Sequence, residues 1–406
     1  MEAFMKLRNL TIFLILCIIS CFLFGCTEEK QEETKDPSII NSGVFRIGLL
    51  TDDDNTSKLT EQGFTYANSL ANKVNIDEVV EIQTSVITLD TEADASECAN
   101  KLIDEDISAV VINTANESAF DSACSVFDKE NIAVISISPF EYESDNVFKL
   151  NLNDEYIASC ALTYAKEQGY SKTAILLESD SENNKSFERT YSSTHKAYLD
   201  SEPTVYYLSG DSKNYTADAV FAGNYDLIFI SDRNNQESVI SELKKKGYSG
   251  TIMLPEMLDK SLYLKETYNN CYAISKSEYD ISNNISTVFY TQFSEHIGVS
   301  CEDVSAASAY GYDAYMVIFE SLKSFSKFDN SSIFNNTSTT ETSAVSKPDE
   351  ILSSDFISAL KGVSYHGVTD TITFINNNTS PTYIYVDYIL NSNVFTDNKY
   401  VFNKTN

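Results

Sequence analysis

Two polar residues follow an apolar run of this chain, where a short helical segment is expected to begin. Thr114 and Ser118 come after residues 109–112 (AVVI), which read as a buried strand. A turn that leads into a helix presents free backbone N–H groups and the positive end of the helix dipole, and both favour a carboxylate. The residues at 113–118 therefore predict an anion-binding turn. The alternative is that Ser118 only caps the helix.

A second polar turn follows the next apolar run, residues 133–137 (AVISI). Ser138 supplies a further hydroxyl there, and Phe140 supplies an apolar wall. We expect both turns to meet, because the carboxyl ends of neighbouring parallel strands lie at the same edge of a sheet. Ser138 and Pro139 are also compatible with a turn that has no binding role.

Acidic residues end three other expected strands. Asp52 follows 45–50, Asp232 follows 227–230, and Glu256 follows 251–254. A buried carboxylate needs a cation or hydrogen-bond donors to offset its lost hydration, and an ammonium group supplies both. Further acids lie in the first of these loops, namely Asp53 and Asp54, and in the two polar turns, namely Glu117 and Glu141. They suggest a ligand with extra positive charge, such as a basic amino acid or a polyamine, although solvated loop tips are the simpler reading.

Catalytic and metal-binding patterns are missing from the sequence. It has no GxSxG, P-loop or dinucleotide-binding glycine pattern. Its three histidines are scattered, and its cysteines show no CxxC spacing. Paired carboxylates such as Asp52 and Glu256 could serve as acid and base, but nothing else supports this use. We expect no enzyme activity, no cofactor and no metal site.

The elements that carry these residues alternate between strands and helices. Eight segments read as strands, namely 45–50, 79–89, 109–112, 133–137, 173–177, 204–208, 227–230 and 251–254. Six segments read as helices, namely 63–73, 95–103, 119–127, 157–166, 236–246 and 305–324. This alternation predicts α/β architecture with parallel sheets covered by helices on both faces. Because the alternation restarts near residue 150, we expect two doubly wound lobes. The segments 371–374 and 382–390 read as a hairpin with a longer turn between them.

Length and charge limit the classes of function. The chain has 406 residues, too many for one compact core, and its formal net charge is −31. Such a charge repels phosphate backbones, so we expect no nucleic-acid partner. Five cysteines lie beyond the N-terminal region, and Cys98–Cys124 and Cys271–Cys301 are possible disulfide pairs. The odd number leaves at least one thiol unpaired.

The N-terminus has the layout of an export signal. Lys6 and Arg8 precede an apolar run at 10–24, and the polar sequence TEEKQEETKD begins at residue 27. Residues 23–26 (LFGC) resemble the lipobox of bacterial lipoproteins, which implies a cleaved signal peptide at 1–25 and a lipid on Cys26. An uncleaved anchoring helix is the alternative. Residues 26–43 read as a flexible tether, and the Ser/Thr/Asn-rich residues 325–350 read as a loop insertion.

Several segments together resemble type I periplasmic-binding-fold proteins, of the leucine-binding-like branch that serves ABC importers. The segments are FRIGLL at 45–50, AVVINTANESAFDSACSVFDKENIAVISISPF at 109–140, YDLIFISDRNNQESVISELKKKGYSGTIMLPE at 225–256, ASAYGYDAYMVIFESL at 307–322 and FISALKGVSYHGVTDTITF at 356–374. The resemblance implies three crossings between lobes, near 147–153, 273–280 and 365–369. Lobe 1 then comprises 44–150 and 280–366, and lobe 2 comprises 151–279 and 367–406.

The resemblance also implies roles for individual residues. Ser118, with support from Thr114 and Ser138, would bind the α-carboxylate of an amino acid, and Glu256 would receive its α-ammonium group. Phe140 would wall the pocket. Asp232 occupies a position where the family often has an aromatic or polar residue, and Tyr310 is a possible substitute for the aromatic that often covers the ligand.

Two departures from the family pattern affect the second lobe. Residues 179–186 (SDSENNKS) replace the usual loop after the fifth strand, so Asn183 or Lys185 would contact ligand there instead. Asp370 stands where a glycine is usual.

The resemblance implies an extracytoplasmic solute-binding lipoprotein on the outer face of a bacterial membrane. It would be a monomer that captures an amino acid or a related amine between its lobes and delivers it to the membrane subunits of an ABC permease. The alternatives are a ligand sensor with the same lobes, and a degenerate cell-surface domain whose pocket no longer takes a small ligand.

Overall fold

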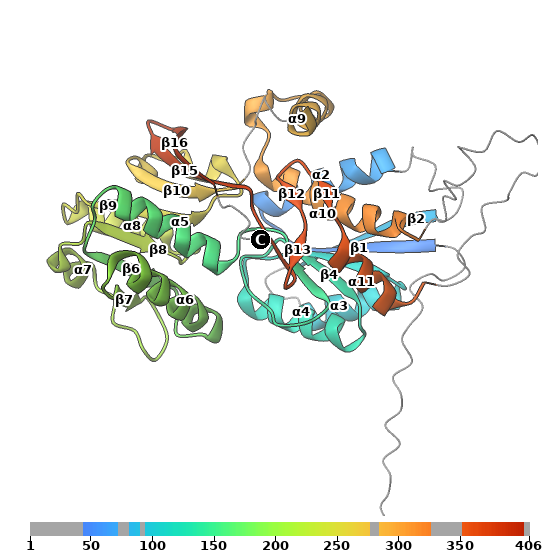
Figure 1. The fold of residues 1–406 in the computed structure, drawn as a ribbon, viewed down its shortest axis with the longest axis horizontal. Coiled ribbons are helices and arrows are strands. Elements are labelled where there is room, and N and C mark those ends of the chain that lie inside the picture. The colour runs from blue at the N-terminus through green and yellow to red at the C-terminus, as the bar shows by residue number, and fades with distance from the viewer. Residues whose placement is uncertain (1–43, 72–80, 90–93, 277–283, 326–350, 402–406) are drawn as a thin grey trace, which may run out of the picture. The chain divides into compact units, whose positions relative to one another are not determined.

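The computed structural model describes residues 44–71, 81–89, 94–276, 284–325 and 351–401 (Figure 1). These residues form two seven-stranded sheets and one short two-stranded sheet. The predicted signal peptide, Cys26, the tether at 26–43 and most of the loop insertion at 325–350 lie outside the described residues.

The sheet of lobe 1 has the strand order β13-β14-β5-β4-β3-β1-β2. Its strands are β1 (Val44–Asp52), β2 (Glu81–Leu89), β3 (Ala109–Asn113), β4 (Ala133–Ser136), β5 (Val147–Lys149), β13 (Phe374–Ile375) and β14 (Asn378–Thr379). All neighbours pair in parallel except β13 with β14. The central strands β3 and β4 are buried along their whole length, which explains why their sequences are continuous apolar runs.

The sheet of lobe 2 has the order β16-β15-β10-β9-β8-β6-β7. Its strands are β6 (Thr173–Leu177), β7 (Thr204–Tyr207), β8 (Leu227–Ile230), β9 (Thr251–Glu256), β10 (Cys271–Ser275), β15 (Tyr383–Leu390) and β16 (Asn393–Val401). Five strands are parallel, and β15 and β16 add antiparallel to one edge. The two-stranded sheet pairs β11 (Tyr365–His366) with β12 (Thr371–Ile372).

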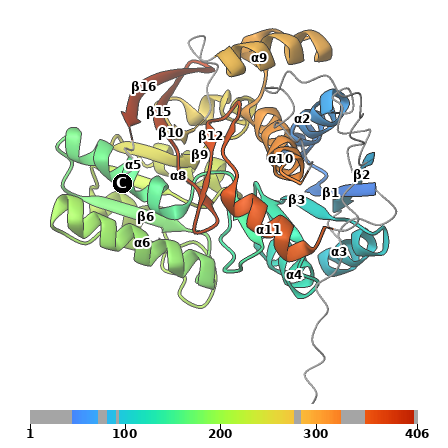
Figure 2. The ribbon, with the colours of Figure 1, turned by 45° about the vertical axis from the view of Figure 1, so that its right-hand side comes forward.

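Helices cover both faces of each sheet (Figure 2). Around the first sheet lie α2 (Asn55–Ala71), α3 (Ala95–Asp104), α4 (Glu117–Lys129), α10 (Ala306–Lys323) and α11 (Ser353–Gly362). Around the second lie α5 (Asp154–Glu167), α6 (Glu182–Leu199), α7 (Ala217–Gly223) and α8 (Gln236–Lys245). Each sheet has a separate apolar core on each face. The predicted fold, with two doubly wound α/β lobes, is confirmed.

One further helix, α9 (Asn284–Ile297), packs its aromatic residues against α2 and α10. Short 3₁₀ turns are η2 (Lys260–Tyr263), η3 (Glu266–Tyr268) and η4 (Cys301–Asp303). The helices α6, α7, α9 and α11 were not among the helical segments expected from the sequence.

Two glycines allow α2 and α10 to pack closely. A Cβ atom on Gly63 would lie 1.8 Å from the backbone oxygen of Ser308, and one on Gly311 would lie 2.0 Å from that of Thr60. No side chain fits at such distances, so the contact between these helices requires glycine at both positions.

The crossings between lobes follow from sheet membership. The first lies between β5 and α5, at residues 150–153, and the second lies between β10 and α9. The third was expected at 365–369, and this is wrong, because β13 and β14 extend the first sheet beyond β5. Residues 367–379 therefore belong to lobe 1, and the chain crosses at 380–382.

The C-terminal strands form two hairpins instead of the single one expected. Strand β13 pairs with β14 around Asn376 and Asn377, and β15 pairs with β16 around Asn391 and Ser392. All four turn residues have positive φ, between 49° and 61°. Two consecutive residues of this kind make the tight turn whose twist suits a hairpin. The expected pairing of 371–374 with 382–390 is wrong, because these segments belong to different sheets.

None of the five cysteines in the described residues forms a disulfide, so the pairs Cys98–Cys124 and Cys271–Cys301 are not bridged. Among the helices of the described ranges, none is long and apolar enough to cross a membrane.

Candidate functional site

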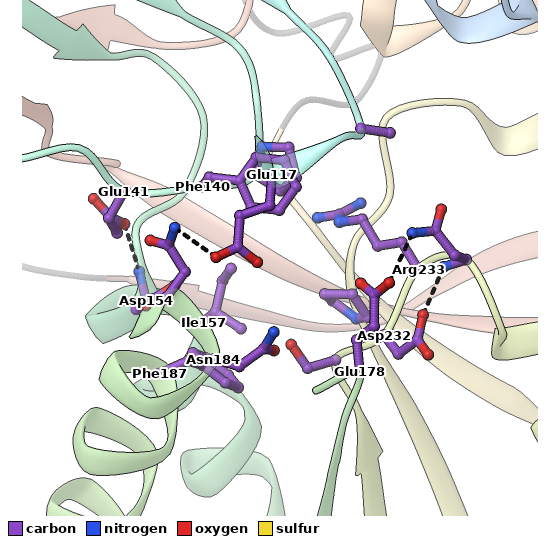
Figure 3. A pocket seen from close by; sticks show the side chains of 16 residues that line it. Glu117, Phe140, Glu141, Asp154, Ile157, Glu178, Asn184, Phe187, Asp232 and Arg233 are labelled. Carbon is purple, nitrogen blue, oxygen red and sulfur yellow. Dashed lines mark hydrogen bonds between the residues drawn. The ribbon is translucent and has the colours of Figure 1, made fainter. Parts of the chain in front are cut away.

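A cavity lies between the two lobes (Figure 3). Its lining comes from loops and helix starts of both lobes: Ala115, Glu117, Pro139, Phe140, Glu141, Asp154, Ile157, Glu178, Asn183, Asn184, Phe187, Ser231, Asp232, Arg233, Asn234 and Pro255. The cavity volume is about 70 Å³. A single ordered water needs roughly 10–15 Å³ on the same measure, so the space admits more than one water or part of a small molecule.

Two acids of lobe 2 lie side by side because their strands are neighbours. Strands β6 and β8 pair in parallel, with Leu176 opposite Ile230. Glu178 and Asp232 each come two residues later, at the carboxyl edge of the sheet. This is the edge where open α/β sheets bind ligands.

Glu117 connects the lobes across the cavity. It is the first residue of α4, and its carboxylate accepts hydrogen bonds from Ser181 Oγ and Asn183 Nδ2, both at 3.0 Å. Ser181 also caps α6, since its Oγ accepts from the backbone N–H of Asn184 at 3.3 Å. The carboxylate therefore lies near the N-termini of two helices, where their dipoles favour negative charge.

A second pair of acids lies near the start of α5. Glu141 forms an ion pair with the buried Lys149 at 2.8 Å, and its Oε1 lies 3.4 Å from the backbone N of Asp154. Burial raises the pKa of Asp154 to about 7. The positive charge of Lys149 opposes this rise, and the negative charge of Glu141 adds to it.

Three acids of the cavity lack a positive partner among the described residues. Within the described parts of the chain, no Lys, Arg or His nitrogen lies within 4 Å of a carboxylate oxygen of Glu117, Glu178 or Asp232. The pKa of Glu178 is raised, first by burial and then by the charge of Asp232, with a smaller contribution from Glu117. The cavity therefore gathers negative charge that the described chain does not neutralise.

Asp232 is held by the turn that precedes α8. Its oxygens accept hydrogen bonds from the backbone N–H groups of Asn234 and Asn235, at 2.8 and 2.9 Å, and from Asn235 Nδ2 at 2.6 Å. These donors fix the carboxylate, which is 2% exposed. The neighbouring Arg233 lines the cavity too, but its Nη1 donates to the backbone oxygen of Glu256 at 2.6 Å.

The predicted anion-binding turn at 113–118 is occupied by a carboxylate of the protein itself. Thr114 Oγ1 and the backbone N–H of Ala115 donate to the two oxygens of Asp52, each at 2.7 Å. The backbone N–H of Thr114 donates to Ser138 Oγ at 2.9 Å. Ser138 and Thr114 are both buried, and neither lines the cavity.

Ser118 does not cap the helix. It is the second residue of α4 and is exposed, whereas Asn116 is the cap and accepts from the N–H of Ala119 at 3.0 Å. Ser118 and Asp52 line a hollow beside the cavity, which shares Ala115 and other lining residues with it.

Glu256 and Tyr310 lie behind the cavity, near the crossing segments. The Glu256 carboxylate is 1% exposed and accepts hydrogen bonds from the backbone N–H of Leu152, at 2.8 Å, and from the hydroxyl of Tyr310. Lys276 Nζ lies 5.6 Å from the centre of the Tyr310 ring. The roles of Glu256 as ammonium acceptor and of Tyr310 as ligand cover stay predictions, and both groups already have partners within the protein.

Of the eight predicted binding residues, Phe140 and Asp232 line the cavity itself. Asn183 also lines it, whereas Lys185 does not. The sequence analysis missed Glu178, although it directly follows the predicted strand at 173–177. It also missed Asp154 and Ile157, near the start of α5, and Phe187, on the second turn of α6.

The described residues contain no group of three or more metal-ligating side chains.

Comparisons with solved structures agree on the fold. A leucine-binding protein, LivK, from Thermotoga maritima has 15% identity and a TM-score of 0.69, and the match covers 87% of this chain and 98% of that one. LivJ from Streptococcus pneumoniae, a branched-chain amino acid transporter substrate-binding protein in complex with isoleucine, has 15% identity, a TM-score of 0.67 and coverage of 88% and 99%. A solute-binding protein of R. palustris in complex with benzoate has 12% identity, a TM-score of 0.65 and coverage of 88% and 96%.

A search of curated proteins gives no match. The family model described as periplasmic binding protein matches residues 45–385, which is most of the sequence. Together with the interlobe cavity, this match shows that the chain belongs to the periplasmic binding protein family.

Proposed function

We propose that this protein is an extracytoplasmic solute-binding protein of an ABC importer and captures an amino acid or a related amine between its lobes. The observation that carries the proposal is the cavity, which is lined from both sheets at the edge where parallel strands end. The bound relatives support a small-molecule ligand, since their solved structures contain isoleucine or benzoate.

The same proposal includes attachment to the membrane surface. A lipid on Cys26 and the tether at 26–43 would hold a monomeric binding domain near the permease. Metabolic labelling with a fatty acid tests the attachment: labelling of the full chain should be lost in Cys26→Ala. Labelling that persists in the variant would contradict the assignment of the lipid to Cys26.

The binding role is tested by titrating the full chain, in detergent, with amino acids, linear amines and benzoate. We expect one saturable site per chain, no chemical turnover, and a melting temperature that rises with ligand concentration, because a ligand that binds only the folded state stabilises it. Absence of binding throughout this panel would contradict the proposal and would favour a domain whose cavity no longer takes a small ligand.

A further inference from the structure

The cavity has a pair of acids at each of two places, and apolar side chains and Glu117 lie between them. Figure 3 shows Glu141 and Asp154 on one side and Glu178 and Asp232 on the other, with Glu117, Ile157 and Phe187 between them in this view. Lobe 2 supplies three of these acids from the ends of β6 and β8 and from the start of α5. A ligand that matches both regions has a positive group at each end and a carbon chain in the middle.

The positively charged side chains near the cavity already have partners within the protein. Lys149 is paired with Glu141, and its Nζ also donates to the backbone oxygens of Pro139 and Phe140, at 3.1 and 3.2 Å. Arg233 donates to the backbone oxygen of Glu256. Glu178 and Asp232 have only neutral donors among the described residues, namely amides and backbone N–H groups. Buried carboxylates without a counter-ion are costly, and a cationic ligand removes that cost.

The turn that the sequence predicted to bind the carboxylate of an amino acid is already filled. Asp52 accepts the hydrogen bonds of Thr114 Oγ1 and the Ala115 N–H, which are the donors of the turn at 113–118. The carboxylate of a free amino acid would have to displace Asp52 or lie beside it, and two carboxylates in one site repel each other. This turn therefore discriminates against ligands that carry a carboxylate.

From these observations we infer that the cavity binds a linear diamine or polyamine without a carboxylate group. One ammonium group lies at Glu178 and Asp232, the other at Asp154 and Glu141, and the methylene chain packs on Ile157 and Phe187. The inference rests on the proposed function, since it names the ligand class of the same cavity.

Matched ligand pairs separate this inference from the general binding role. Cadaverine is lysine without its carboxylate, and isopentylamine is leucine without its carboxylate. Calorimetric titration of the full chain should show binding of cadaverine, or of the related diamine putrescine or triamine spermidine, at least 10-fold tighter than that of lysine. Leucine and isopentylamine should bind weakly, because neither has a second ammonium group.

Two outcomes of the ligand titration have different meanings. If lysine or leucine binds as tightly as cadaverine or more tightly, the diamine inference is wrong and the solute-binding function stands. If no amine, amino acid or benzoate binds, both are wrong.

Variants test the contacts with the best diamine of that panel. Glu178→Gln and Asp154→Asn should each weaken its binding by at least 10-fold. Glu182→Gln is the matched control, because its side chain is 85% exposed on α6 and outside the cavity, and it should change affinity less than twofold. Equal affinity of Glu178→Gln and the control would overturn the assignment of an ammonium group to Glu178.

Asp52→Ala tests the discrimination against carboxylates. Removing this side chain frees the hydrogen-bond donors of Thr114 and Ala115. The affinity for lysine should therefore rise at least fivefold relative to the affinity for cadaverine. The melting temperature of the variant shows whether the fold is retained, and Asp52→Asn, which keeps the size of the side chain, provides a second variant if it is not. An unchanged lysine-to-cadaverine ratio in a folded variant would contradict the role of Asp52.

Discussion

Carboxylates lie in two regions of the molecule, the crossing segments and the cavity, and their partners differ. Near the crossings, the Asp313 carboxylate accepts hydrogen bonds from the backbone N–H groups of Val368 and Thr369, at 2.9 and 2.7 Å, and from Thr369 Oγ1 at 2.7 Å. Glu256 accepts from Leu152 and Tyr310. In the cavity, Glu178 has a single donor among the described residues, Asn234 Nδ2 at 3.5 Å.

The crossing segments also contain a buried cation. Lys276 Nζ donates to the backbone oxygen of Leu150 at 2.9 Å and to Thr379 Oγ1 at 3.3 Å, so it links the ends of β5, β10 and β14. Burial lowers the pKa of Lys276, while the charges of Asp370, Glu256 and Asp313 oppose this shift. The acids of the crossings thus stabilise the fold, whereas Glu178 in the cavity remains available to a ligand. If this comparison is right, removing Asp313 and removing Glu178 should have opposite effects on stability.

The largest expected effect is that of Asp313→Ala. This change leaves two buried N–H groups and a hydroxyl without their acceptor and removes a negative charge near Lys276. We expect the free energy of unfolding to fall by about 3–5 kcal/mol, because each buried donor that loses its acceptor costs about 1–3 kcal/mol. Urea denaturation measures the change.

The exposed Asp355 on α11 supplies the control, and Asp355→Ala should change the stability little. A similar, small effect in both variants would show that the crossing acids are no more important to the fold than surface acids.

The central strands and the principal helices could be predicted because their apolar patterns are continuous. Strands β3, β4, β6 and β8 are buried on both faces, so every residue contributes to the signal. The two-residue strands β13 and β14 carry no such signal, and the paired asparagines between them specify a turn without specifying the sheet. For this reason the third crossing was placed too early.

The site was predicted in part for a related reason. Phe140 and Asp232 were found because they follow predicted strands, and parallel strands present their carboxyl ends to one edge. The order of the strands, which brings Glu178 beside Asp232, is not contained in local patterns. Nor does the position after a strand distinguish a carboxylate that faces the cavity from Glu256, which faces the backbone of Leu152.

A smaller loss of stability is expected for Tyr310→Phe. The change removes one buried hydrogen bond to a charged acceptor, the Glu256 carboxylate, and leaves the ring in place. Such bonds contribute about 1.5–3 kcal/mol, and urea denaturation should show a loss in this range. The affinity for the best diamine, measured by titration, should change less than twofold. A 10-fold loss of affinity with unchanged stability would instead support the sequence-based roles of Tyr310 and Glu256 at the ligand.

The smallest expected effect, and the one of opposite sign, is that of Glu178→Gln in the ligand-free protein. Because the pKa of Glu178 is raised in the folded state, the folded protein holds this proton to higher pH than the unfolded chain does. In the wild type, the contribution of Glu178 to stability is therefore greatest below the ordinary glutamate pKa, near 4.3. This contribution falls as the pH rises through the raised pKa of Glu178 in the folded protein. Glutamine cannot ionise, so this loss disappears in the variant.

We expect Glu178→Gln to raise the free energy of unfolding by about 0.5 kcal/mol at pH 7, the size usual for partly solvated charges, and to leave it nearly unchanged at pH 4. Urea denaturation at both pH values measures the difference, with Glu182→Gln as the exposed control. A variant that is less stable than the wild type at pH 7 would mean that Glu178 is held by the protein as Asp313 is, and the contrast between the two regions would be lost. A gain in stability together with weaker diamine binding is the pattern expected of a residue that serves the ligand at some cost to the fold.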